Sequence, residues 1–296
     1  MLLTDLFKRK EFVITSEVGP PKGCQIDTLL ERADLFLRGV HAVNVTDCQA
    51  SVMRLGSLAV CKALRDIGIN PVLQLTCRDR NRIALQSDLL SAAYFGINNV
   101  LLLTGDHTTL GDAPGAKPVY DLDSVTLLQA TSKLEQGVDL DDNELTGAPP
   151  VFAKGAVVSP CSDCVDAQLY KMERKIAEGA QFFQTQAVYE PEKFIAFMER
   201  AKQFGVPVML GMVILKRASM ANFMNKNIAG VSIPQHVIDK LAQDPAKANA
   251  GVTGNASCRG VEIAVQVIKD CRPYCQGLHI MPLGWEDKVP ELLSCL

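Results

Sequence analysis

Polar residues able to do chemistry stand at the ends of short apolar segments in this sequence. Glu17 closes the segment VITSE, and the Gly-Pro-Pro that follows Val18 turns the chain sharply and stiffens its exit. Burial in an apolar setting favours the protonated form of a carboxyl group, which suits a general acid. Glu17 is therefore a candidate catalytic acid, and a carboxylate paired with a neighbouring Lys or Arg is the alternative.

Asp106 closes a second such segment, LLLTGD. The preceding Gly105 lets the backbone approach a ligand closely. The two residues indicate a ligand contact, although an Asx turn or a helix cap at the start of a loop explains them equally well.

Gln184 and Gln186 lie in a third segment, FFQTQAV. Side chains alternate along a strand, so the two amides share one face and Thr185 occupies the other. Buried amides need hydrogen-bond partners. Two of them on one face favour recognition of a heterocycle with several donors and acceptors, and pairing with neighbouring strands is the alternative.

Arg174 and Lys175 are adjacent within a helical pattern. Neighbouring side chains on a helix splay about 100° apart, so the pair does not form one patch. A solvated helix face is the default interpretation, and contact with a phosphate at the edge of the fold is the alternative.

Ten cysteines are many for a chain expected to be cytoplasmic. Cys161 and Cys164 form a C-x-x-C pair, and Cys271 and Cys275 form a C-x-x-x-C pair. The expected elements place the two pairs at opposite ends of the fold, so no shared metal site is predicted. A redox or partner-contact role for one pair stays open.

These candidates need a scaffold that brings strand ends together. Eight segments have strand character, and the first four begin about 29 residues apart, as do the fifth and sixth, which is typical of a repeating strand–helix unit. The expected strands span residues 13–18, 42–47, 71–77, 99–106, 153–159, 182–188, 206–215 and 277–283. Amphipathic helical patterns lie between them at 27–38, 51–67, 81–95, 123–136, 163–179 and 191–204. Glycines stand where several of these helices should end, namely Gly39, Gly68, Gly96, Gly179 and Gly205.

Alternating strands and helices, with most strands apolar on both faces, predict a single (β/α)8 TIM barrel over residues 1–296. Residues 1–12 are expected to form a short capping helix, and loop insertions are expected after strands 4 and 7. A doubly wound open sheet is the alternative, but no G-x-G-x-x-G follows the first strand. In a barrel the active site lies at the C-terminal ends of the strands, where the polar candidates gather.

Composition excludes several classes of protein. The 296 residues are 48% hydrophobic and 21% charged, so a disordered chain is not expected. The net charge is −3, so a protein that binds nucleic acid through its phosphates is not expected. No apolar window of about 18 residues predicts a membrane span, and the first residues lack the pattern of a signal peptide. A cytoplasmic protein with neither nucleic-acid nor membrane partners is expected.

Seven segments with distinctive residue patterns span nearly the whole chain. They are SEVGPP at 16–21, VNVTD at 43–47, LQLTC at 73–77, LLLTGD at 101–106, KGAVVSP at 154–160, MERKIAEGAQFFQTQAVYE at 172–190 and GLHIMPL at 277–283. In this order they together resemble the methylenetetrahydrofolate reductase family, whose members are flavin-containing barrels, and they resemble its short prokaryotic form.

The resemblance implies reduction of 5,10-methylenetetrahydrofolate to 5-methyltetrahydrofolate, a step towards methionine biosynthesis, by hydride transfer from reduced FAD. Glu17 matches the family's general acid, Asp106 matches an Asp near the flavin and the pterin, and Gln186 matches an amide that binds the pterin. The resemblance also assigns cofactor contacts to Thr46, Asp47, Gln74, Thr104, Gly105, Asp106, Ser159, Arg174 and Lys175.

Some positions depart from the family's pattern. Gln74 replaces a frequent His, Thr104 replaces an Arg, and residues 155–157 replace a Tyr-Pro-Glu segment. These changes keep FMN as an alternative to FAD and leave the electron donor open between NAD(P)H and an iron–sulfur protein. A homo-oligomer or a hetero-complex is expected. Two other functions stay open: a pterin-binding one-carbon or methyl transferase without flavin, and a non-catalytic barrel subunit of a redox complex.

Overall fold

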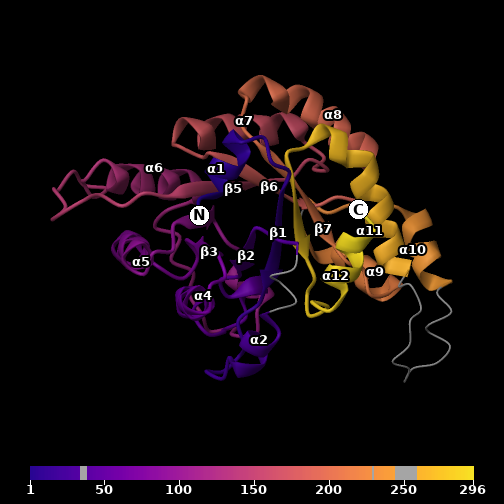
Figure 1. Ribbon diagram of the computed structural model, residues 1–296, viewed down its shortest axis with the longest axis horizontal. Coiled ribbons are helices and arrows are strands. Elements are labelled where there is room, and N and C mark those ends of the chain that lie inside the picture. Colours follow the sequence, from indigo (N-terminus) through magenta and orange to yellow (C-terminus); the bar gives the residue numbers. More distant parts are fainter. Residues whose placement is uncertain (34–38, 229, 244–258) are drawn as a thin grey trace.

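The computed structural model describes residues 1–33, 39–228, 230–243 and 259–296. Eight parallel strands form a closed barrel in the order β1 to β8, and β8 pairs back with β1 (Figure 1). The strands are β1 (Val13–Val18), β2 (Ala42–Val45), β3 (Pro71–Thr76), β4 (Asn99–Leu103), β5 (Ala153–Val158), β6 (Phe182–Ala187), β7 (Val208–Val213) and β8 (Gly277–Met281). The predicted (β/α)8 fold class is confirmed.

Helices surround the strands (Figure 1). Those described are α1 (Leu3–Lys8), α2 (Asp27–Glu31), α4 (Ser57–Asp66), α5 (Arg82–Tyr94), α6 (Ser124–Glu135), α7 (Val165–Ala177), α8 (Pro191–Ala201), α9 (Ala218–Asn227), α10 (Gln235–Ala242), α11 (Arg259–Cys271) and α12 (Lys288–Ser294). Short 3-10 turns are η1 (Gln49–Ser51), η2 (Thr108–Leu110), η3 (Lys202–Phe204) and η5 (Arg272–Tyr274). The helical pattern predicted at 27–38 is described only in part, because residues 34–38 lie outside the described residues.

Local sequence signals account for most element ends. Asn81 accepts a hydrogen bond from the N–H of Ala84 at the start of α5, and Asp123 forms a capping box at the start of α6. Gly179, which follows α7, has a φ of 102°, as a left-handed residue after a helix requires. Strand β4 ends at Leu103, three residues earlier than predicted, because the chain turns at Gly105 with a φ of 92°.

The N-terminal end of the barrel, which we call the floor, is closed by apolar side chains. Helix α1 inserts Leu3 and Leu6 against the inward-facing residues of that end, and Asn99 accepts a hydrogen bond of 2.8 Å from the N–H of Leu3. The inward-facing residues of the floor are Val13, Ala42, Val72, Leu101, Ala153, Phe182 and Met209. The floor is therefore a packed apolar plug.

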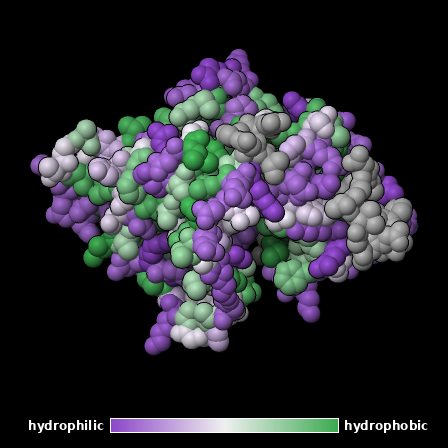
Figure 2. All heavy atoms as spheres, turned by 60° about the horizontal axis from the view of Figure 1, so that its bottom comes forward, coloured by the Kyte–Doolittle hydropathy of each residue, from purple (hydrophilic) through white to green (hydrophobic). Residues whose placement is uncertain are grey.

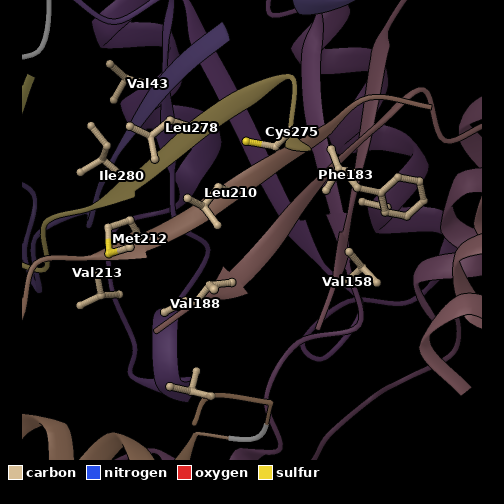
Figure 3. Packing of buried hydrophobic residues seen from close by; sticks show 14 of the residues in the cluster. Val43, Val158, Phe183, Val188, Leu210, Met212, Val213, Cys275, Leu278 and Ile280 are labelled. Atoms are coloured by element: carbon tan, nitrogen blue, oxygen red, sulfur yellow. The ribbon is translucent and has the colours of Figure 1, made fainter. Parts of the chain in front are cut away.

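A second apolar layer lies between the strands and the helices. Outward-facing strand residues such as Val43, Phe183 and Leu210 pack there against the inner faces of the helices (Figure 3). Both faces of the strands are thus buried, which explains their nearly continuous apolar sequence. The outer surface mixes hydrophilic and hydrophobic residues on the face that Figure 2 presents.

The insertions lie where they were predicted. Residues 104–123, with η2, follow β4, and α9 and α10 follow β7 before α11 begins. Both insertions leave from the C-terminal ends of strands, which we call the mouth of the barrel. Within the described residues, no helix is long and apolar enough to cross a membrane.

Candidate active site at the mouth of the barrel

Glu17 lies at the mouth end of β1 and is 7% exposed. Its Oε2 accepts a hydrogen bond of 3.0 Å from Gln74 Nε2, and its Oε1 accepts one of 3.3 Å from Gln49 Nε2. His279 Nε2 lies 3.6 Å from the same Oε2. No Lys or Arg of the described residues pairs with Glu17, so the alternative of a paired structural carboxylate does not hold in that form.

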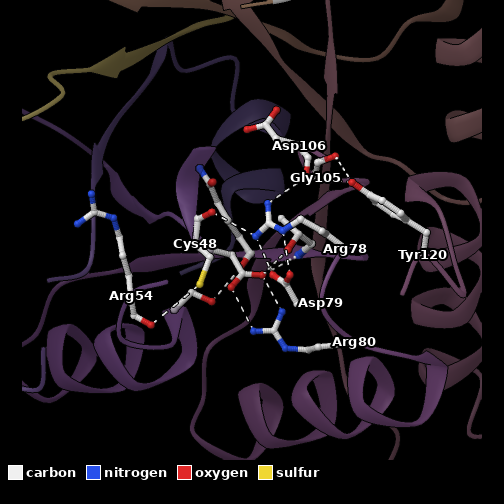
Figure 4. Close-up of polar contacts among 12 residues, drawn as sticks. Cys48, Arg54, Arg78, Asp79, Arg80, Gly105, Asp106 and Tyr120 are labelled. Atoms are coloured by element: carbon white, nitrogen blue, oxygen red, sulfur yellow. Dashed lines mark hydrogen bonds and ion pairs between the residues drawn. The ribbon is translucent and has the colours of Figure 1, made fainter. Parts of the chain in front are cut away.

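Asp106 is held at the mouth by its backbone and leaves its side chain free (Figure 4). Its carbonyl oxygen accepts hydrogen bonds from the Tyr120 hydroxyl at 2.9 Å and from Arg78 Nη1 at 3.3 Å. The carboxylate is exposed and bonds to no described residue, which excludes the Asx-turn alternative. Asp106 is thus fixed in place with its charge available to a ligand.

The two amides of β6 have different surroundings. Gln184 is 1% exposed and lies deeper in the barrel, where its Oε1 accepts a hydrogen bond of 2.9 Å from Asn44 Nδ2. Gln186 is half-buried at the mouth, and its amide bonds to no residue that the structure describes. The alternative of pairing with neighbouring strands therefore applies to Gln184, while Gln186 is free to contact a ligand.

Thr46 and Asp47 follow β2 and also differ. Thr46 Oγ1 is buried and has no hydrogen-bond partner among the described residues. Asp47 is saturated, because Arg80 contacts both of its carboxylate oxygens at 2.7 and 3.1 Å. Thr76 adds two further hydrogen bonds to the same carboxylate, from its N–H at 2.9 Å and from its hydroxyl at 2.8 Å. Asp47 therefore joins the ends of β2 and β3.

Three other predicted residues line the mouth. Thr104 Oγ1 accepts a hydrogen bond of 3.2 Å from the N–H of Ser124, the first residue of α6. Gly105 packs against Thr76, so that a Cβ on it would lie 3.0 Å from the Thr76 Cβ. Ser159 is half-buried, and its hydroxyl has no partner within the described part of the chain.

Arg174 and Lys175 point in different directions, as their spacing predicted. Arg174 is exposed on α7, whereas Lys175 turns inward and donates a hydrogen bond of 2.7 Å from Nζ to the carbonyl of Val157. Burial lowers the pKa of Lys175 to about 8, with a smaller contribution from the charge of Lys171. The ammonium group of Lys175, half-buried at the end of β5, therefore releases its proton more readily than that of an exposed lysine.

Sequence reasoning missed Gln49, which reaches Glu17 from a strained segment. Cys48, Ala50 and Ser51 have φ values of 43°, 53° and 59°, a left-handed conformation that non-glycine residues rarely adopt. Gly111 packs closely against this segment, and a Cβ atom on Gly111 would lie 1.9 Å from the Ser51 carbonyl oxygen. Such strain is often found at functional sites. No local sequence signal marks it, since none of the three is glycine.

Arg78 and Arg80 were also missed. Arg78 is 1% exposed and donates to the carbonyl of Cys48 at 3.2 Å as well as to that of Asp106 (Figure 4). It therefore joins the strained segment to the loop after β4. The sequence CRDR at 77–80 carries both arginines, and two cations directly after a strand were the signal that could have found them.

The surface hollows lie apart from these residues, and the two cysteine pairs add no ligand set to them. Cys161 follows β5 and Cys275 precedes β8, and the charge of Cys161 contributes to the raised pKa of the buried Cys271 thiol, so the predicted separation of the two pairs to opposite ends of the fold is not complete. Among the described residues no group of three or more His, Cys, Asp or Glu could hold a metal ion. Hollows of about 480 and 420 Å³ lie beside Lys154 and Gln276, near the floor. We place the candidate site at the mouth, because the unpaired polar groups are there.

The family model and the related sequences agree on one family. The family model described as "Methylenetetrahydrofolate reductase" matches residues 2–296. Methylenetetrahydrofolate reductase 1 of Schizosaccharomyces pombe is 27% identical over 241 residues, which cover 78% of this chain and 36% of that protein. A probable methylenetetrahydrofolate reductase (NADPH) of Caenorhabditis elegans is 22% identical over 275 residues, which cover 92% of this chain and 39% of that protein. The chain thus spans less than two fifths of the length of these relatives.

Solved structures support the fold. An uncharacterized protein from Clostridium thermocellum that binds two copies of 5-methyl-5,6,7,8-tetrahydrofolic acid superposes with a TM-score of 0.64 at 13% identity, covering 100% of this chain and 97% of that one. A 2,3-dimethylmalate lyase superposes with a TM-score of 0.56 at 11% identity, covering 99% of this chain and 85% of that one. Since the family model matches nearly every residue, the chain belongs to the methylenetetrahydrofolate reductase family.

Proposed function

We propose that the protein reduces 5,10-methylenetetrahydrofolate to 5-methyltetrahydrofolate with a bound flavin, and that Glu17 is the general acid. The observation that carries this proposal is the position of Glu17, buried at the mouth of a barrel of this family and held by two amide donors. General acids need such a fixed, partly desolvated carboxyl group. The shared family supports the substrate class.

The residues of the mouth fit a flavin. Thr46 Oγ1 is a buried polar atom without a partner, and the Ser159 hydroxyl is unpaired within the described residues. With Asp106, and with Arg174 for the phosphates, these groups would hold the cofactor directly. Bound flavin, FAD with FMN as the alternative, supplies the hydride.

The remaining predicted cofactor residues are committed to neighbours within the chain. Asp47 is paired with Arg80, Lys175 with the Val157 carbonyl, and Gln74 with Glu17. Thr104 and Gly105 shape the loop after β4. We infer that these residues act on the cofactor chiefly by fixing the strand ends that hold it.

The chain's own residues account for the proton chemistry. The five-membered ring of the substrate must open to an iminium ion before it accepts hydride, and Glu17 gives its proton to the departing ring nitrogen. Gln74 and Gln49 fix the orientation of the carboxyl group during this step. The free carboxylate of Asp106 stabilises the cation, and the free amide of Gln186 hydrogen-bonds the pterin.

The electron donor is a separate part of the proposal. One relative carries NADPH in its name, which favours NAD(P)H as the donor for this chain as well. An iron–sulfur protein in a hetero-complex is the alternative, and a homo-oligomer is the expected assembly if NAD(P)H reacts directly. The proposed setting is the cytoplasm.

Absorption spectra of the purified protein test the function. We expect flavin bands that bleach with anaerobic NADH or NADPH and return when 5,10-methylenetetrahydrofolate is added. Bands that bleach only with dithionite, but still return with the folate, would identify a partner protein as the donor. Protein that lacks flavin bands and does not bind added FAD or FMN would overturn the proposal in favour of a flavin-free pterin transferase or a non-catalytic subunit.

A further inference from the structure

A chain of polar side chains runs from Glu17 down into the middle of the barrel. His279 of β8 lies 3.6 Å from Glu17 Oε2 through its Nε2, and its Nδ1 lies 2.9 Å from Thr15 Oγ1. Thr15 Oγ1 also accepts a hydrogen bond of 3.3 Å from Gln184 Nε2. Gln184 in turn pairs with Asn44, whose Nδ2 donates to Gln184 Oε1 at 2.9 Å. Four strands thus contribute to one connected set.

This set is unusual for its depth. Thr15 and Asn44 are fully buried, and His279 is only 3% exposed. Barrel interiors are usually filled by branched apolar residues, and burying polar groups costs free energy unless each finds a partner. Here the partners form a line that ends at Glu17, so the set supports that carboxyl group rather than the apolar packing of the floor.

We propose that His279 is a positioning residue that shares with Glu17 the proton used to open the substrate ring. This inference rests on the proposed function. In the loaded pair one proton is held between the Glu17 carboxylate and the neutral His279 imidazole. Transfer to the ring nitrogen breaks the bond of that proton to the pair and leaves the carboxylate and the neutral imidazole, while the opened substrate becomes a cation. Solvent at the mouth returns a proton to the Glu17–His279 pair after each turnover.

The surroundings of His279 explain why the pair is isolated. Strand β1 places Thr15 and Glu17 beside the imidazole, and β7 places Gly211 beside it, which has no side chain. Across the barrel lie the neutral amides of Gln184 and Asn44. Glu17 is the charged group among these contacts, and it faces the imidazole directly.

NMR spectra of the histidine rings test this contact without cofactor or substrate. The chain has four histidines, and His279 can be assigned from the signal lost in His279→Gln. If that variant fails to fold, substitution of His41, His107 and His236 assigns it by elimination. In Glu17→Gln we expect the ring signals of His279 to move, because the imidazole loses its facing carboxylate.

The chain contains a matched control pair. His41 Nε2 lies 3.8 Å from Glu11 Oε2, a distance similar to that in the buried pair, but these side chains are 28% and 40% exposed. Solvent screens such a pair, so Glu11→Gln should move the ring signals of His41 much less. A displacement of the His279 signals in Glu17→Gln that is no larger than that of His41 in Glu11→Gln would overturn the proposal.

Kinetics of the two half-reactions then test the role in catalysis. Thr15→Val removes the contact at Nδ1 without touching Glu17, and His279→Gln removes the imidazole. We expect flavin reduction by dithionite to be unchanged, and reoxidation by methylenetetrahydrofolate to slow by about ten-fold in Thr15→Val and about a hundred-fold in His279→Gln. Unchanged reoxidation, with an unchanged pH profile, would reject His279 as the proton partner. Wild-type protein without any folate reduction would instead reject the proposed function and leave the NMR result standing.

Discussion

The two ends of this barrel are built from the same eight strands but differ in how their side chains are satisfied. At the floor, Leu3 and Leu6 of α1 seal a layer of apolar residues, and Asn99 is paired with the backbone of Leu3. At the mouth, Thr46 Oγ1 is buried without a partner and the carboxylate of Asp106 bonds to no described residue. The polar groups of the floor are therefore paired within the chain, whereas the mouth has polar groups without partners among the described residues.

Backbone conformation follows the same division. The left-handed residues Cys48, Ala50 and Ser51 lie at the mouth, and each such residue costs roughly 1 kcal/mol or more. Arg78 and the loop after β4 hold this segment in place and keep Gln49 on Glu17. Apolar packing is thus concentrated at one end of the strands and unpaired polar groups at the other, the end where active sites generally lie in this fold.

The largest effect on stability is expected at the floor. Phe182 is fully buried there, and its ring lies 5.9 Å from that of Phe7. Phe182→Ala should lower the free energy of unfolding by about 3–5 kcal/mol, because it removes apolar contacts and leaves a cavity. Urea unfolding measures this change. The folded fraction should still reoxidise its flavin with the folate within about two-fold of the wild-type rate, and a much slower rate would break the division between the ends.

The next effect concerns a structural ion pair at the mouth. Asp47 is buried and depends on Arg80 for two contacts. Arg80→Met should destabilise the protein by about 3 kcal/mol, since it leaves a buried carboxylate without its cation. The matched control is the double variant with Asp47→Asn, which should recover part of that loss in the same urea experiment. Equal stability of the single and double variants would show that the pair is not coupled.

Removal of the Lys175 charge, unlike that of Arg80, should stabilise the folded protein at neutral pH. The pKa of Lys175 is lowered by burial from 10.5 to about 8, so between these pH values the unfolded chain holds a proton that the folded protein has released. The wild-type free energy of unfolding, relative to Lys175→Met, should therefore rise with pH from about 8 to about 10.5. At pH 7 Lys175→Met should be more stable by about 1–2 kcal/mol, after allowing for the lost hydrogen bond to Val157. Thermal unfolding across this range measures it, and a flat difference would contradict the assigned burial of the ammonium group.

The smallest effect on stability is expected at Arg174. The side chain is exposed on α7, so Arg174→Ala should change the free energy of unfolding by less than about 0.5 kcal/mol. The same variant should bind FAD more weakly but FMN about as well as wild type, if the guanidinium contacts the second phosphate or the adenosine side. Fluorescence titration with each flavin makes this comparison. Equal losses for both flavins would place the contact elsewhere.

Local sequence signals predicted those features that depend on residues close together in the chain, namely the strands and the helix ends. The strands followed from their apolar runs, and the helix ends followed from glycines such as Gly179 with positive φ. Glu17 was found because it stands at a strand end before Gly-Pro-Pro. No local signal set His279 apart, because its contact with Thr15 joins residues 264 positions apart and forms only when the barrel closes. The pairing of Asp47 with Arg80 and the strain around Gln49 depend on tertiary contacts in the same way.

Single-turnover reoxidation of reduced flavin in Glu17→Gln tests the central claim most directly. Glutamine keeps the shape and one acceptor oxygen, so either Gln74 or Gln49 must turn its amide to face the new NH2 group, but glutamine has no acidic proton to give. We expect the variant to bind flavin and to unfold at wild-type urea concentrations, while methylenetetrahydrofolate reoxidises it about a thousand-fold more slowly. A rate within about ten-fold of wild type would contradict the assignment of Glu17 as the acid and of the mouth as its site.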